Sequence, residues 1–88
     1  MSEVIDESQE VSVYPNPNNG QFTLSLSNNT GNCNVEIYNV LGEKVYTETL
    51  PQSQSNINLT EQPNGVYLYR VLAKNGQLIG EGKVILQR

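Results

Sequence analysis

The carboxylates are the first candidates for chemistry in this 88-residue chain. Beyond the first ten residues they are five glutamates, at positions 36, 43, 48, 61 and 81. General acid–base catalysis needs two carboxylates that face each other across a cleft. Glu36 and Glu48 instead fall on outward positions of predicted strands, and Glu43 and Glu61 fall in predicted turns. We therefore expect solvated surface charges rather than an acid–base site.

Nucleophilic and metal chemistry lack their usual residues in this sequence. The chain has no histidine, so neither a Ser-His-Asp set nor a base for a cysteine nucleophile can form. Cys33 is the single cysteine, which excludes an internal disulfide and a zinc cluster, and we expect it to be buried on a strand. Asp6, Glu7 and Glu10 carry oxygens that calcium accepts, but calcium takes about six to eight of them. We expect no enzyme activity, no metal and no cofactor.

Three tyrosines suggest a different kind of site. Tyr38, Tyr46 and Tyr69 could form an exposed aromatic platform on which a sugar stacks, as in a carbohydrate- or surface-binding module. The alternative is ordinary cross-strand pairing of aromatic side chains on one face of a sheet. The glycosylation triplets at residues 28–30 and 58–60 arise easily in an asparagine-rich chain and carry little weight.

The charge distribution divides the chain into two parts. Residues 1–10 carry four acidic side chains and no basic one, whereas residues 11–88 balance five acids with five bases. A neutral body argues against a nucleic-acid partner and against docking to anionic lipid. The N-terminus has neither the basic nor the apolar region of a signal peptide, and no apolar run is long enough to span a membrane. We interpret residues 1–10 as the remnant of an acidic linker and residues 11–88 as one domain of a larger protein.

A proline- and asparagine-rich corner, Tyr14-Pro15-Asn16-Pro17-Asn18-Asn19-Gly20, precedes the clearest strand of the sequence. The two prolines fix φ, remove two N–H donors and favour extended geometry at the residues before them. Asn19-Gly20 can supply the positive φ of a tight turn. The stretch is therefore predicted to turn sharply between two strands.

Short apolar alternations separated by turn residues predict seven strands and no helix. The strands are expected at about 10–14, 21–27, 33–39, 44–50, 56–60, 66–73 and 78–86. Strand 66–73 is nearly all apolar and should be central, because it must be covered on more than one side. The sequence predicts an all-β fold, a seven-stranded antiparallel immunoglobulin-like β-sandwich.

Several turns and one aromatic residue refine this prediction. Gly42 should close a hairpin whose Leu41 plugs the end of the sandwich, and Asn75-Gly76 should close another. Gly80 and Gly82 indicate a bulge or bend in the last strand. Tyr67 stands just after a Pro-Asn-Gly turn, as in a tyrosine corner, although an ordinary core position would also explain it.

The order of these pieces resembles the type A C-terminal sorting domain of the type IX secretion system. That pattern opens with a Tyr-Pro-Asn-Pro corner and a later glycine, continues with an Asn-x-x-Gly turn and a Gly-Val-Tyr strand start, and closes on a Lys-led apolar strand. The residues that carry the resemblance are Tyr14, Pro15, Asn16, Pro17, Gly20, Gly42, Gly65, Tyr67, Lys83, Val84, Ile85 and Leu86. Many members end in lysine, whereas this chain ends in Gln87-Arg88.

The resemblance implies a secretion address attached to an N-terminal cargo domain of a Gram-negative bacterium. The expected partners are the type IX translocon with its shuttle components and a sortase-like peptidase that cuts in the linker. The expected route runs through the periplasm to the cell surface or the medium. The final strand could also pair with a receptor or form an edge-strand dimer. An immunoglobulin-like spacer and a carbohydrate-binding module remain as alternatives.

Overall fold

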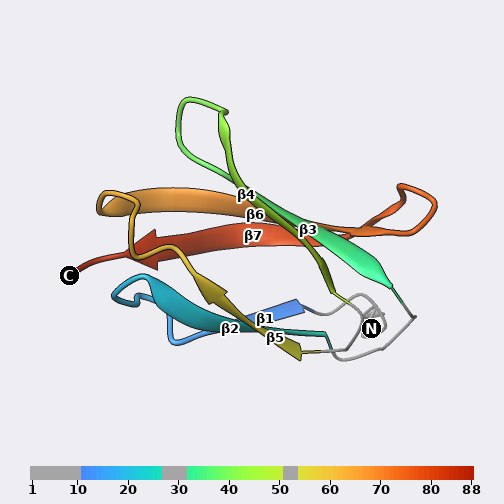
Figure 1. Ribbon diagram of the computed structural model, residues 1–88, viewed down its shortest axis with the longest axis horizontal. Coiled ribbons are helices and arrows are strands. Elements are labelled where there is room, and N and C mark those ends of the chain that lie inside the picture. The colour runs from blue at the N-terminus through green and yellow to red at the C-terminus, as the bar shows by residue number, and fades with distance from the viewer. Residues whose placement is uncertain (1–10, 27–31, 51–53) are drawn as a thin grey trace, which may run out of the picture.

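The computed structural model describes residues 11–26, 32–50 and 54–88, and these residues form strands and turns only (Figure 1). The seven strands are β1 Val11–Tyr14, β2 Gln21–Leu26, β3 Cys33–Tyr38, β4 Lys44–Leu50, β5 Gln54–Asn58, β6 Gly65–Ala73 and β7 Leu78–Leu86. β4 and β7 have the predicted bounds, and β6 begins one residue early. Predicted strand ends at residues 10 and 27 lie outside the described residues, as do the turn at 28–31 and the loop at 51–53.

The strands form two antiparallel sheets that face each other as a sandwich. One sheet has the order β1-β2-β5, and the other has the order β4-β3-β6-β7. In immunoglobulin lettering this is A-B-E against C′-C-F-G, so the fourth strand has moved from the first sheet to the second relative to the constant-type domain. The predicted immunoglobulin-like sandwich is confirmed, and β6 lies inside its sheet as expected.

The core is built from the apolar positions that alternate along each strand. β2 buries every second residue, and β3 buries Cys33, Val35 and Ile37 as predicted. Since successive side chains of a strand point to opposite faces, one buried set from each sheet fills the space between the layers. The buried apolar residues are Phe22, Leu24, Leu26, Cys33, Val35, Ile37, Leu50, Ile57, Leu59, Tyr67, Tyr69, Val71, Val84 and Leu86.

β5 begins two residues earlier than predicted and ends two residues earlier. Gln54 and Ser55 pair with β2, although their polar side chains do not predict a strand. At the other end the chain leaves the sheet after Asn58, whose side-chain oxygen accepts hydrogen bonds from the backbone and hydroxyl of Thr60. Ile57 and Leu59 are both buried as predicted, although Leu59 lies in the turn.

The two glycines of β7 have different structural roles. Gly80 pairs with Val71 and Leu78 pairs with the next residue of β6, which leaves Ile79 as the extra residue of a bulge, as predicted. Gly82 pairs with Tyr69, and a Cβ placed on Gly82 would lie 2.5 Å from the Tyr69 hydroxyl oxygen. The missing side chain of Gly82 therefore makes the room in which the Tyr69 ring is buried.

Substitution of Gly82 by alanine should destabilise the fold, because the added methyl group would lie within 3.0 Å of the hydroxyl oxygen and two ring carbons of the buried Tyr69. We expect a loss of about 1–3 kcal/mol in the free energy of unfolding, which is typical of overpacking. Urea denaturation of Gly82→Ala, Tyr69→Leu and the double variant measures it. In the Tyr69→Leu background the alanine should cost much less; an equal cost in both backgrounds would contradict the role assigned to Gly82.

Candidate functional site at the corner end of the sandwich

The Asn16 side chain acts as a short piece of strand on the free edge of β7. Its amide nitrogen donates to the Lys83 carbonyl oxygen over 3.0 Å, and its amide oxygen accepts from the Ile85 N–H over 2.9 Å. These are a donor and an acceptor in the arrangement that a neighbouring strand would present. The peptide bonds before Pro15 and Pro17 are both cis. The corner thus lies against the last strand, 67 to 69 residues away in sequence.

Asn18 continues this pairing with its backbone. Its N–H donates to the Ile85 carbonyl over 2.9 Å, and its carbonyl accepts from the Gln87 N–H over 2.7 Å. The side chain holds the corner itself, since it donates to the Pro15 carbonyl over 3.0 Å and accepts from the Gly20 N–H over 2.8 Å. Asn18 is only 6% exposed and is the one buried polar side chain among the described residues.

Gly20 is the point at which the corner meets the turn after β5. Its φ is +115°, and a Cβ would lie 2.9 Å from the Thr60 Cα. Its carbonyl accepts a 2.6 Å hydrogen bond from the Leu59 N–H. A side chain is therefore excluded here both by backbone conformation and by space.

The start of β6 is fastened to the turn before it. The Tyr67 hydroxyl donates to the Pro63 carbonyl over 2.6 Å, and the ring is 3% exposed, which confirms the predicted tyrosine corner. Arg88 binds the same turn from the chain's last position. Its guanidinium donates to the Thr60 carbonyl over 2.6 Å and to the Asn64 side chain over 3.0 Å.

The hairpin between β3 and β4 is organised by Asn39. The Asn39 side-chain oxygen accepts from the N–H groups of Leu41 and Glu43, each over 3.0 Å, and its nitrogen donates to the Glu43 carboxylate over 2.8 Å. Gly42 has the positive φ of +85° that this turn needs. The prediction that Leu41 plugs the sandwich end is wrong, since its side chain is 79% exposed. The Asn39 bonds hold it away from the core.

Residues 15–20, 59–65 and 86–88 gather at one end of the sandwich (Figure 1, left). The hairpin at residues 39–43 projects at the top of Figure 1 and borders residues 62–67 across a groove. We call these four segments together the corner end. The twelve residues singled out in the sequence lie in these segments or on the strand ends that lead into them. Tyr14 closes β1, with its hydroxyl accepting from Gln54 over 3.1 Å. Val84 and Leu86 are core residues, whereas Ile85 is 38% exposed on the outer face. Sequence reasoning assigned no side-chain role to Asn18, Asn39 or Arg88. The side chains of Asn18 and Asn39 bind residues two to four positions away, within their own turns. The partners of Arg88 lie 24 and 28 residues away and are set by the fold.

Comparison with known proteins identifies the family of this chain. Residues 12–87 match the secretion system C-terminal sorting domain. The chain belongs to that family. It is the sorting domain of type IX secretion that the ordered motifs resembled, a signal carried by secreted cargo. A similar protein is the ulvan lyase NLR42 of Nonlabens ulvanivorans, which is 36% identical over 69 residues; these are 77% of this chain but 13% of the lyase.

The corner also changes what the sorting domain's last strand can do. Its four hydrogen bonds to β7 occupy the outer edge of that strand between Lys83 and Gln87. An edge is open to strand addition only where its backbone groups are unpaired. Strand addition or an edge dimer on this stretch of β7 would first have to displace the corner.

The glutamates of the sorting domain lie apart from the corner's hydrogen bonds. Glu36 accepts from the Tyr38 hydroxyl over 2.6 Å and lies 3.5 Å from the Lys44 ammonium nitrogen. The Tyr38 hydrogen bond, helped by the Lys44 charge, lowers the pKa of Glu36, and the same hydrogen bond raises the pKa of Tyr38. A carboxylate held ionised in this way suits a surface ion pair rather than a general acid.

Two predictions about the sheet surface are wrong. Glu48 pairs with the buried Val35, so it projects from the core-facing side of the edge strand β4 and not outward. Tyr46 lies on the same side and donates its hydroxyl hydrogen to Glu48. Tyr69 is 7% exposed and belongs to the core. The three tyrosines therefore form no exposed platform, which removes the observation behind a carbohydrate-binding module.

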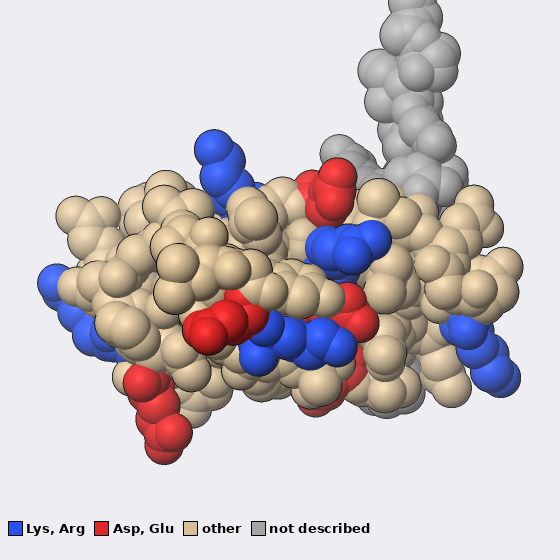
Figure 2. Space-filling view, turned by 90° about the horizontal axis from the view of Figure 1, so that it is seen from above, with Lys and Arg blue, Asp and Glu red and all other residues tan. Residues whose placement is uncertain are grey.

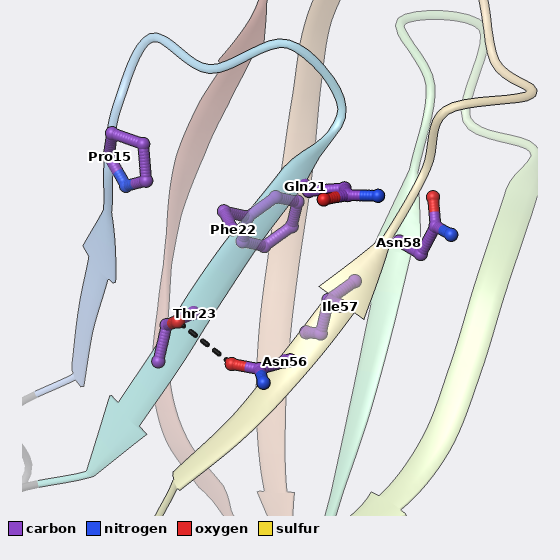
Figure 3. A pocket seen from close by; sticks show the side chains of 7 residues that line it. All are labelled: Pro15, Gln21, Phe22, Thr23, Asn56, Ile57 and Asn58. Carbon is purple, nitrogen blue, oxygen red and sulfur yellow. Dashed lines mark hydrogen bonds between the residues drawn. The ribbon is translucent and has the colours of Figure 1, made fainter.

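A shallow groove of about 420 Å³ lies on the outer side of sheet β1-β2-β5 (Figure 3). Its polar lining pairs across the strands, with the Thr23 hydroxyl donating to the Asn56 side chain over 2.9 Å. Phe22 and Ile57 border the groove but are buried beneath it. Pro15 is the exposed apolar group in its lining. The Tyr14 ring, which is 47% exposed, lies on the same face of the sheet beside Thr23.

The described residues of the sorting domain offer no other centre for chemistry. They contain no group of three metal-ligating side chains, and no helix within them is long and apolar enough to cross a membrane. On the face seen in Figure 2, basic and acidic side chains are interspersed and neither sign gathers into a patch. A partner of this face would not be attracted by net charge.

Removal of the Asn18 side chain should loosen the corner. Asn18→Ala leaves the Gly20 N–H and the Pro15 carbonyl without their partner in a buried place, so we expect a loss of about 1–3 kcal/mol in the free energy of unfolding. The matched control is Asn19→Ala. The Asn19 side chain accepts a 3.2 Å hydrogen bond from the Gln21 N–H at an exposed position, where water can replace it, so the change should be about 0.5 kcal/mol or less. Urea midpoints decide between them, and equal shifts would contradict the role of Asn18.

Alkaline pH should weaken the fold through Tyr46. Burial, together with the hydrogen bond to Glu48, raises the pKa of Tyr46 above its ordinary value of 10.0. Because Tyr46 then loses its phenolic proton at lower pH in the unfolded chain than in the folded one, its contribution to the free energy of unfolding is fully present below pH 10 and falls as the pH rises further. Denaturation series at pH 9, 10 and 11 should show a shallower decline for Tyr46→Phe than for wild type. Parallel declines in the two proteins would exclude Tyr46 as a cause.

Proposed function

We propose that the domain is a non-catalytic address that directs an attached cargo protein through the type IX outer-membrane translocon. The family match over residues 12–87 carries this proposal. The corner end supports it, because residues at both ends of the matched stretch meet there and are bonded to each other. An address must present a constant shape, and a corner bonded both to the end of β7 and to the turn after β5 provides one.

The cargo would join at the other end of the domain. β1 begins at Val11, which pairs with Leu26, whereas Tyr14 and Thr23 lie next to the corner. The start of β1 therefore points away from the corner end (Figure 1). A cargo domain attached through residues 1–10 would leave the corner end accessible to the machinery.

On this proposal residues 1–10 are the linker in which a sortase-like peptidase cuts after export. The cargo passes through the periplasm, where the domain folds and meets the shuttle and translocon components, and it is then delivered to the cell surface or the medium. The linker's four acidic side chains and its lack of apolar residues beyond a short pair suit an exposed protease substrate.

A fusion export assay tests this function. Residues 1–88 are attached to the C-terminus of a periplasmic fluorescent reporter, and the fusion is expressed in a bacterium with a type IX system and in a strain that lacks the translocon. We expect reporter at the surface or in the medium of the first strain only. The mass of the exported reporter then locates the cut in or after residues 1–10.

A second fusion carrying an unrelated β-sandwich of similar size is the control for a passive spacer. It should stay in the periplasm of both strains. Export of this control, or retention of the wild-type fusion in both strains, would contradict the address function.

A further inference from the structure

Two aliphatic side chains at the corner end are exposed far more than the rest. Val40 is 75% exposed and Leu41 is 79% exposed. The other exposed large hydrophobic residues of the described chain range from 38% to 47%. Burying such a side chain in the core would stabilise the domain, so its outward position needs a reason.

The hairpin that carries these residues is held by five hydrogen bonds of Asn39. Besides the three Asn39 side-chain bonds, the Asn39 N–H donates to the Glu43 carbonyl and the Gly42 N–H donates to the Asn39 carbonyl, each over 3.0 Å. Leu41 takes part directly, since its own N–H is bound to Asn39. A turn fixed in this way presents Val40 and Leu41 in one geometry, which lowers the entropy cost of binding a partner.

An uncharged groove runs beside the exposed pair. It has a volume of about 210 Å³ and lies between the hairpin and the segment from Gln62 to Tyr67. Its lining contains apolar, amide and backbone groups and no charged side chain. The exposed Val66 lines it, and its cross-strand partner Ile85 continues the apolar surface onto β7.

The occupant that fits is a protein surface with an apolar pocket. Anionic lipid or polysaccharide would call for basic side chains, and the groove lining has none. The face in Figure 2 likewise mixes both charges. The position also fits a partner outside the cargo protein, because β1 begins at Val11, at the opposite end of the domain.

We propose that Val40 and Leu41 form a docking knob that inserts into an apolar pocket of a type IX translocon or shuttle protein. The inference rests on the proposed function and names the surface through which it acts. It also explains the Asn-x-x-Gly motif physically: Asn39 and Gly42 shape the turn, and the two residues between them make the contact.

The first test is a double substitution, Val40→Asn with Leu41→Asn, in the reporter fusion. Both side chains are mostly exposed, so the urea midpoint of the 88-residue domain should stay near that of wild type, while export falls by about tenfold or more. The matched control is Leu78→Asn, which polarises an exposed leucine at the opposite end and should be exported like wild type.

A photo-crosslinking residue in place of Leu41 identifies the occupant, with the same residue at Leu78 as control. We expect an adduct with a type IX translocon or shuttle protein from position 41, about tenfold stronger than from position 78. Adducts of equal strength, or binding of the domain to protein-free outer-membrane lipid vesicles that the double substitution abolishes, would overturn the protein-docking inference. Failure of the wild-type fusion to be exported would refute the proposed function instead, whereas normal export of the double variant would refute the knob alone.

Discussion

The hydrogen bonds between the corner and the edge of β7 join the first and last strands of the sequence at one end of the sandwich. Asn16 and Asn18 supply two donors and two acceptors to a strand that would otherwise end the sheet with unpaired backbone groups. Since a chain of 88 residues has a small core, such a fastening matters to its stability. The corner is at once a turn, an edge cover and the central part of the corner end.

Most motif residues at the corner end have structural roles. Gly20 leaves room for Thr60, and the Tyr67 hydroxyl binds the Pro63 carbonyl before β6. Gly42 supplies the positive φ of the turn that Asn39 holds. Val84 and Leu86 fill the core. Residues with these roles determine the shape of the surface. The contacts are then left to their exposed neighbours, of which Val40 and Leu41 are the most prominent.

The strands could be predicted because alternation of apolar side chains follows from burial of one sheet face. The errors arose where pairing decides the direction of a side chain. Glu48 faces the core side because it pairs with Val35, which its own polarity cannot indicate. Leu41 points outward because Asn39 holds its backbone, so hydrophobicity alone misplaced it. The corner's attachment to β7 spans nearly the whole chain and left no local signal.

On the proposed function, an address of this kind would be recognised only after folding. The corner end is assembled from four segments between residues 15 and 88, and no single segment contains its shape. The docking knob lies beside a groove formed by a turn more than twenty residues away, and the corner is completed only when the last strand has paired. An unfolded tail therefore offers the machinery none of the surface. On the proposed function, this geometry would couple delivery of the cargo to a correctly folded signal, which a short linear peptide signal would not do.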